Sequence, residues 1–144
     1  MKPIHLFLAI SLLSSVGAFA QGIARVDVFK SPTCGCCAAW IAHLRQNGFE
    51  VVSHDVNDVP EQRKKLGMPE RFGSCHSAKV GAYVIEGHVP AADIQHLLKQ
   101  KPQALGLAVP SMPPGSPGMD IPNSPHYETL LVHADGSSQI YAKH

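Results

Sequence analysis

This sequence lacks a marked excess of either positive or negative charge. Its 144 residues carry 12 basic and 11 acidic side chains, a formal net charge of +1, and no run rich in lysine or arginine. Proteins that bind nucleic acids or anionic membrane surfaces usually carry a basic patch or stripe. The balance therefore excludes nucleic acid as an expected partner and gives no electrostatic basis for attachment to a membrane surface.

Cysteine is scarce too, but its placement is informative. Only four cysteines occur, and three of them, Cys34, Cys36 and Cys37, stand within the tetrad of residues 34–37; the fourth is Cys75. A chain of this length can bury a sufficient core as one domain without disulfide staples. The crowding predicts a soft-metal or redox site. A structural disulfide between the tetrad and Cys75 is the simpler alternative, but it leaves two thiols unexplained.

Residues 1–20 have the composition of a secretory signal peptide. Lys2 is followed by an uncharged apolar stretch that ends in Ala18-Phe19-Ala20, a small-residue cleavage pattern. We predict cleavage after Ala20, which leaves residues 21–144 as an exported mature domain without a membrane segment. An uncleaved membrane anchor is the alternative, because the apolar run approaches spanning length, but the serines within it disfavour an anchor.

Export would change the chemistry expected of the cysteines. In an oxidising compartment free thiols tend to pair, so crowded ones must be oxidised, kept reduced by a partner protein or protected by a metal. The tetrad is therefore expected to be a redox or metal site rather than a set of idle thiols.

Apolar periodicity predicts an α/β domain. The expected elements are a strand at 24–30, a helix from the tetrad to Asn47-Gly48 with Thr33 as N-cap, a strand at 49–56, a helix at 59–66, strands at 82–85 and 88–89 around Glu86-Gly87, a helix at 90–101, and a hairpin of 127–133 and 139–142. The order β-α-β-α-β-β-α, followed by this C-terminal β-hairpin, is that of a thioredoxin-like single domain.

A Pro/Gly-rich segment separates the last helix from the C-terminal hairpin. Seven of the twelve prolines fall between Pro102 and Pro125. Leu105, Leu107 and Val109 supply apolar burial, so we predict a long ordered loop rather than a disordered linker. Long ordered loops in compact domains are often functional.

The start of a helix favours thiolates, because its unpaired N–H groups and dipole lower thiol pKa values. Cys34 and Cys37 form a Cys-x-x-Cys pair, which suits a reversible disulfide. In a regular turn Cys36 would point about 160° away from Cys34. Thiols that point in such different directions around the helix would converge poorly on a single tetrahedral zinc. Several Cu(I) ions could instead share bridging thiolates, with Cys75 as the fourth sulfur ligand.

Other soft or borderline donors accompany the cysteines. His76 follows Cys75 directly, and Met112 and Met119 lie in the Pro/Gly-rich loop; we name these three as accessory metal ligands. Of the remaining histidines, His88 and His126 are the best further candidates. No cluster of carboxylates accompanies the cysteines, which excludes calcium and magnesium sites.

Several motifs together resemble the CopG-type copper-resistance proteins, small exported proteins formerly grouped as a domain of unknown function. The motifs lie at Phe29–Cys37 (Phe-Lys-Ser-Pro-Thr-Cys-Gly-Cys-Cys), Ser74–His76 (Ser-Cys-His), Gly81–Pro90 (Gly-x-Tyr-Val-Ile-Glu-Gly-His-Val-Pro), Gly106–Pro110 (Gly-Leu-Ala-Val-Pro) and Gly115–Met119 (Gly-Ser-Pro-Gly-Met). The resemblance implies a periplasmic copper-binding resistance protein with a thioredoxin-like fold and its metal at the Cys-x-Cys-Cys motif. It also implies copper ions and other periplasmic copper-handling or redox proteins as partners.

Two functions remain open from the sequence. The first is copper binding, as Cu(I) or in cycles with Cu(II), through Cys34, Cys36, Cys37 and Cys75. The second is thiol-disulfide oxidoreduction, in which Cys34 attacks a substrate disulfide and Cys37 resolves it. No proline precedes the expected third strand, where thioredoxins carry a cis-proline facing their cysteines. The departure favours a metal site over general disulfide exchange.

Overall fold

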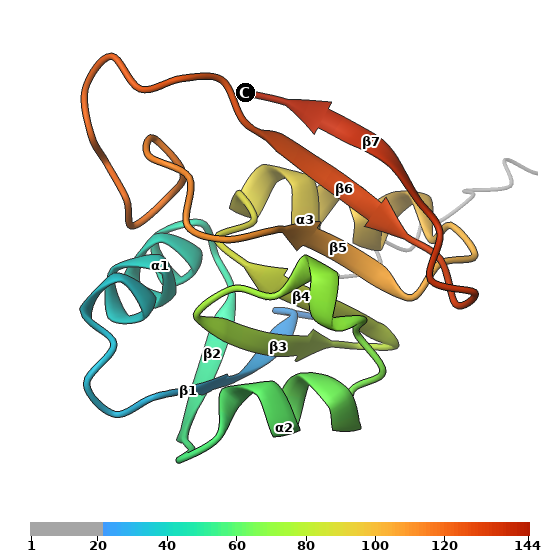
Figure 1. Cartoon of the computed structure of the whole chain (residues 1–144), viewed down its shortest axis with the longest axis horizontal. Coiled ribbons are helices and arrows are strands. Elements are labelled where there is room, and N and C mark those ends of the chain that lie inside the picture. Colours follow the sequence, from blue (N-terminus) through green and yellow to red (C-terminus); the bar gives the residue numbers. More distant parts are fainter. Residues whose placement is uncertain (1–21) are drawn as a thin grey trace, which may run out of the picture.

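The computed structural model describes residues 22–144, so the predicted signal peptide lies outside the described residues. Three α-helices flank a seven-stranded sheet (Figure 1). The helices are α1 (Gly35–Gln46), α2 (Val59–Lys65) and α3 (Ala91–Gln100), with a short 3₁₀ turn η1 (Glu70–Phe72). The strands are β1 (Arg25–Lys30), β2 (Glu50–Asp55), β3 (His76–Val80), β4 (Tyr83–Gly87), β5 (Gly106–Val109), β6 (Glu128–Val132) and β7 (Ser138–Lys143). None of these helices is long and apolar enough to cross a membrane.

The first four strands and the three helices confirm the thioredoxin-like order. The sheet runs β2-β1-β3-β4-β5-β6-β7. β1 and β2 are parallel and joined through α1, whereas β3 is antiparallel to both β1 and β4. The predicted C-terminal hairpin is also present, as β6 and β7. It extends the sheet beyond the thioredoxin-like part.

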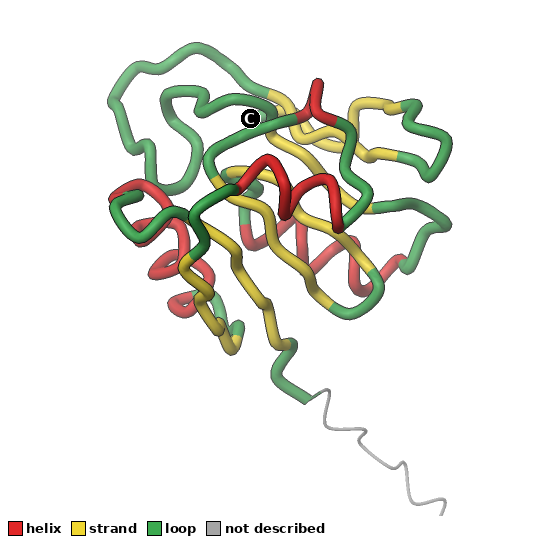
Figure 2. Tube along the Cα trace, turned by 60° about the horizontal axis from the view of Figure 1, so that its bottom comes forward, coloured by secondary structure: helices red, strands yellow, loops and turns green. Residues whose placement is uncertain are grey.

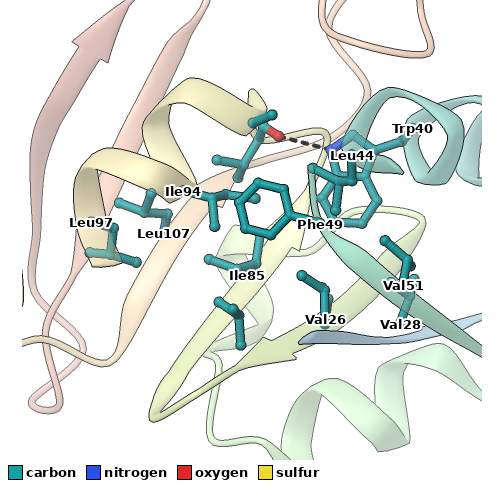
Figure 3. Packing of buried hydrophobic residues seen from close by; sticks show 14 of the residues in the cluster. Val26, Val28, Trp40, Leu44, Phe49, Val51, Ile85, Ile94, Leu97 and Leu107 are labelled. Carbon is teal, nitrogen blue, oxygen red and sulfur yellow. Dashed lines mark hydrogen bonds between the residues drawn. The ribbon is translucent and has the colours of Figure 1, made fainter. Parts of the chain in front are cut away.

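The two faces of the sheet are covered by different helices (Figures 1 and 2). Because successive side chains of a strand point to opposite faces, Ile85 packs under α1 and α3 while Val84 packs beside Phe72 on the other face. Figure 3 shows the larger cluster, in which Trp40 of α1 is fully buried and its Nε1 donates a 2.8 Å hydrogen bond to the Val89 carbonyl. This bond ties α1, which carries the tetrad, to the segment that follows β4.

One predicted turn is misplaced. The sequence suggested a hairpin turn at Glu86-Gly87, but the turn lies at Gly81-Ala82, between β3 and β4. Glu86 and Gly87 are buried at the end of β4, while Gly81 and Ala82 are exposed. The prediction was wrong because a charged residue beside a glycine resembles a surface turn, whereas Glu86 is paired inside the protein.

A strand also lies where only a loop was predicted. All residues of β5 are buried, and the strand pairs in parallel with β4 and antiparallel with β6. The nearby prolines hid this short strand in the sequence. Residues 110–126 remain without helix or strand, and this Pro/Gly loop arches back toward α1 (Figures 1 and 2).

We predict that Gly106→Ala lowers the free energy of unfolding by at least about 3 kcal/mol. A Cβ at Gly106 would overlap the backbone of Val84 on the neighbouring strand. The matched control is Gly22→Ala, where a Cβ meets nothing within 4 Å, and its expected change is within about 0.5 kcal/mol. Urea denaturation of both variants checks the prediction, which equal stabilities would contradict.

Candidate metal centre

The pairing of β1 with β3 brings the two cysteine-bearing segments together. Lys30, the last residue of β1, lies opposite His76, the first residue of β3. The C-terminal end of β1, which leads to the tetrad, therefore lies beside the N-terminal end of β3, which follows Cys75. Residues far apart in the sequence meet there because of the strand register.

Cys34 begins α1 from outside the helix. It is the N-cap, with φ −77° and ψ 96°, and its Sγ accepts a 3.3 Å hydrogen bond from the Cys37 N–H. The predicted N-cap Thr33 was wrong, because the turn closed by Cys34 N–H and the Ser31 carbonyl places the helix start one residue later. The prediction that the thiols of Cys34 and Cys36 point in nearly opposite directions was wrong for the same reason. It assumed that Cys34 has helical backbone angles, whereas Cys34 lies outside the helix.

The four cysteine sulfurs converge. Cys36 Sγ lies 3.5 Å from Cys34 Sγ and 3.8 Å from Cys75 Sγ, and Cys37 Sγ lies 3.5 Å from Cys75 Sγ. All four sulfurs are within 4.8 Å of one another. With zinc–sulfur bonds of ~2.3 Å, ligand sulfurs at a tetrahedral zinc would be ~3.8 Å apart. Sulfur spacing alone therefore does not argue against a single tetrahedral ion, contrary to the expectation from the sequence.

Cys34 and Cys37 are joined by a disulfide, while Cys36 and Cys75 are free. The alternative of a structural disulfide between the tetrad and Cys75 is thus not what the structure contains. Two electrons must reduce the disulfide before all four sulfurs can act as thiolate ligands.

His88 is the main site residue absent from the predicted ligand set. It is buried, and its Nε2 lies 3.0 Å from Cys75 Sγ. Its Nδ1 lies 2.8 Å from the Pro117 carbonyl, which can only accept, so Nδ1 carries the hydrogen and Nε2 of the neutral ring has a free lone pair. Metal-binding histidines commonly donate their second N–H in this way. His126, the other histidine singled out, instead bonds the His144 carbonyl.

His76 lies deeper than His88. It is fully buried, its ring is 4.3 Å from that of Trp40, and its Nδ1 is 3.4 Å from Cys75 Sγ. Burial lowers the pKa of His76 to about 3, with the neighbouring His88 acting in the same direction. The ring is therefore neutral at physiological pH, and Nε2 has no hydrogen-bond partner among residues 22–144.

The Pro/Gly loop reaches the cysteines through one of its two methionines. Met112 is 46% exposed, with its Sδ 4.0 Å from Cys36 Sγ. Met119 makes no comparable sulfur contact with a cysteine in the described part of the chain; its backbone closes turns with Gly115 and Ser116. The loop packs closely on α1, because a Cβ at Gly118 would lie 2.8 Å from the Cys36 carbonyl.

Comparisons with known proteins identify two family models and two solved structures that resemble the chain. Residues 72–119 match the model of a family described as a protein of unknown function, DUF411, and residues 26–69 match the glutaredoxin model. A solved structure described as copper resistance protein CopG, form 2, shares 38% identity over 85% of this chain and 98% of its own, with a TM-score of 0.80. Form 1 gives 39% identity, 83% and 96% coverage and a TM-score of 0.78.

The chain belongs to the CopG copper-resistance protein family. The family resemblance expected from the motifs is thereby confirmed. No curated protein matched the chain. In this chain the part that matches the glutaredoxin model contains the tetrad, and the part that matches the DUF411 model contains Cys75, His88 and Met112.

The Cys75 thiol is held in its protonated form. Burial raises its pKa to about 12, and the neighbouring Cys36 adds to the effect, while a hydrogen bond from Ser74 opposes it. Because His88 Nε2 presents a lone pair, the Cys75 S–H is the donor in their 3.0 Å contact. A metal bound between these two atoms would take the place of that proton.

We predict that Cys75 is alkylated at least about 10-fold more slowly in the folded, copper-free protein at pH 8 than in urea, since only thiolate reacts. The rate should keep rising toward pH 12, because the raised pKa delays thiolate formation. Iodoacetamide labelling under non-reducing conditions, followed by peptide mass spectrometry, measures the rate of Cys75 alkylation. Equal rates in folded and unfolded protein would contradict the prediction.

Proposed function

We propose that this protein binds copper as Cu(I) through Cys34, Cys36, Cys37 and Cys75, with His88 as a further ligand. The observation that carries the proposal is the convergence of four sulfurs within 4.8 Å, with an imidazole nitrogen 3.0 Å from one of them. Thiolate and imidazole ligands suit Cu(I), and the solved relatives are described as copper resistance proteins.

We further propose that the centre holds several copper ions bridged by shared thiolates. Successive sulfurs form a closed ring, with contacts from Cys34 to Cys36, Cys36 to Cys75 and Cys75 to Cys37, and the disulfide closing it. Each sulfur thus has two sulfur neighbours, so a thiolate can share metal ions on both sides. Met112, at the exposed side of Cys36, is proposed as an accessory ligand.

Two of the predicted accessory ligands receive different roles. His76 has its Nδ1 3.4 Å from Cys75 Sγ, and we propose that it assists by orienting this sulfur. Met119 is left out of the proposed ligand set, because its contacts within residues 22–144 hold the loop rather than approach a cysteine.

The disulfide supports a redox role for the same centre. Reducing the Cys34–Cys37 bond takes two electrons and yields two thiolates, and oxidising two Cu(I) ions to Cu(II) releases two electrons. We infer that the protein couples these half-reactions, so that two Cu(I) ions and the disulfide interconvert with two Cu(II) ions and two thiolates. A single exchange balances without a further reactant, whereas repeated cycling needs an external electron donor or acceptor, which we propose is another periplasmic redox protein.

We also propose that the protein acts in the periplasm after cleavage at Ala20, exchanging copper or electrons with other periplasmic proteins. The proposal rests on the signal-like composition of residues 1–20. The mature protein isolated from the periplasm should begin at Gln21, which N-terminal mass spectrometry checks.

We expect the reduced protein to take up several equivalents of Cu(I) in an anaerobic titration against a competing chelator. Each Cys→Ser change should lower that number, and His88→Ala should weaken binding without removing a sulfur. Trp40, the single tryptophan, lies 4.3 Å from His76 and gives an intrinsic fluorescence signal. Saturation at one equivalent would argue for a mononuclear carrier, and one tightly bound zinc without copper, in protein from copper-fed cells, would overturn the proposal.

A thiol-disulfide oxidoreductase is the second candidate function. The Cys34–Cys37 disulfide at the start of α1 and the glutaredoxin match favour it. Cys34 is partly exposed and would attack a substrate disulfide, while the buried Cys37 would displace the mixed disulfide and release the reduced substrate.

The variant Cys36→Ser separates the two functions, because it keeps Cys34 and Cys37. Under the copper proposal, it should lose copper equivalents and copper tolerance in cells. Retained copper tolerance together with full disulfide-reductase activity would instead establish the second function.

A further inference from the structure

A buried ion pair lies directly behind the loop that carries Cys75. Arg63 of α2 and Glu86 of β4 are 3% and 0% exposed, and Arg63 Nε lies 2.9 Å from Glu86 Oε1. Within residues 22–144, no hydrogen bond joins either residue to a cysteine. Their shared neighbour is Ser74, which precedes Cys75 in the chain.

The pair binds Ser74 at both of its backbone polar groups. Glu86 Oε1 accepts a 2.8 Å hydrogen bond from the Ser74 N–H, and Arg63 Nη2 donates a 2.7 Å bond to the Ser74 carbonyl. The carboxylate thus binds the peptide group between Gly73 and Ser74, and the guanidinium binds the next one, between Ser74 and Cys75. Such charge-assisted bonds are short and directional.

The remaining polar atoms of the pair are also satisfied. Glu86 Oε2 accepts a 2.5 Å bond from Ser77 Oγ, and Arg63 Nη1 bonds Glu70 Oε1 at 2.8 Å. Burying an ion pair is often no more stabilising than burying apolar residues of the same size. Stability alone therefore explains the presence of this buried pair poorly. Its two hydrogen bonds to the Ser74 backbone offer a more specific explanation.

The loop that carries Cys75 borders open space. A cleft of about 470 Å³ is lined in part by Arg63, Ser74, Cys75 and Met112. The ion pair is one of the attachments that hold the loop beside this cleft, and the hydrogen bonds that join Ser111 to Gly73 and Ser74 are others.

We propose that Arg63 and Glu86 are positioning residues for the copper centre. They fix the backbone at Ser74 so that the Cys75 sulfur stays 3.8 Å from Cys36 Sγ and 3.5 Å from Cys37 Sγ. The inference rests on the proposed copper function and adds residues outside the ligand set to it. Outer residues that orient metal ligands typically affect metal affinity by 10–100-fold.

The test is an anaerobic Cu(I) competition titration of the reduced protein carrying Glu86→Gln or Arg63→Lys. The amide keeps the size of Glu86 but removes its charge, and lysine cannot bond Glu86, Glu70 and Ser74 with one planar group. We expect about 10- to 100-fold weaker copper binding with an unchanged number of equivalents. In the copper-free protein, Cys75 alkylation should become several-fold faster.

Two control variants separate positioning from loss of stability. Ser77→Ala removes a bond to the same carboxylate but leaves both bonds to Ser74. Asp93→Asn alters another buried acid, which bonds Thr129 and His144 and makes no hydrogen bond to a cysteine. Both controls should keep copper affinity within about 2-fold of wild type and leave Cys75 alkylation unchanged, because the Ser74 contacts persist.

The outcomes decide the inference as follows. Wild-type affinity in both Glu86→Gln and Arg63→Lys would overturn it, as would an equal loss in either control. Should Glu86→Gln fail to fold, Arg63→Lys alone decides. If wild-type protein binds no copper, the proposed function fails, and the positioning role is then decided by Cys75 alkylation, which must still be faster in the two variants than in the controls.

Discussion

The register between β1 and β3 is the constraint on which the centre depends. Because Lys30 pairs with His76, the helix start that bears three cysteines and the loop that bears the fourth emerge side by side. A shift of one residue would turn the side chains of β3 to the opposite faces of the sheet and displace Cys75, which directly precedes the strand. The buried core around Trp40 packs helices α1 and α3 against the sheet (Figure 3) and so holds the helix that carries the tetrad.

The segment after α3, which extends the thioredoxin-like part, contributes further residues to the candidate metal centre. β5 continues the sheet beyond β4, and the Pro/Gly loop after it returns over α1. Pro117 of this loop fixes the tautomer of His88, and Met112 approaches Cys36. A redox dithiol at a helix start is thereby enclosed by sulfur and imidazole donors from a second segment, which suits a soft metal ion.

Local signals made much of this architecture predictable. Alternation and helix stops sufficed to predict the thioredoxin-like order, and the Cys-x-Cys-Cys spacing indicated the cysteines whose sulfurs the structure brings together. Features set by long-range pairing could not be predicted from the sequence. The short strand β5 lies among prolines that are typical of a loop. Glu86 resembled a turn residue because its partner Arg63 lies 23 positions away in the chain. His88 is brought to Cys75 by the end of β4, and the sequence indicated it only as one of two further histidine candidates, without a spacing that relates it to the cysteines.

The central claim is that these sulfurs jointly bind copper. X-ray absorption spectroscopy at the copper edge, on anaerobically loaded protein, tests it most directly. The account predicts Cu(I) with sulfur as the dominant first-shell scatterer and a short copper–copper vector from bridging thiolates. A first shell of nitrogen and oxygen alone would contradict it.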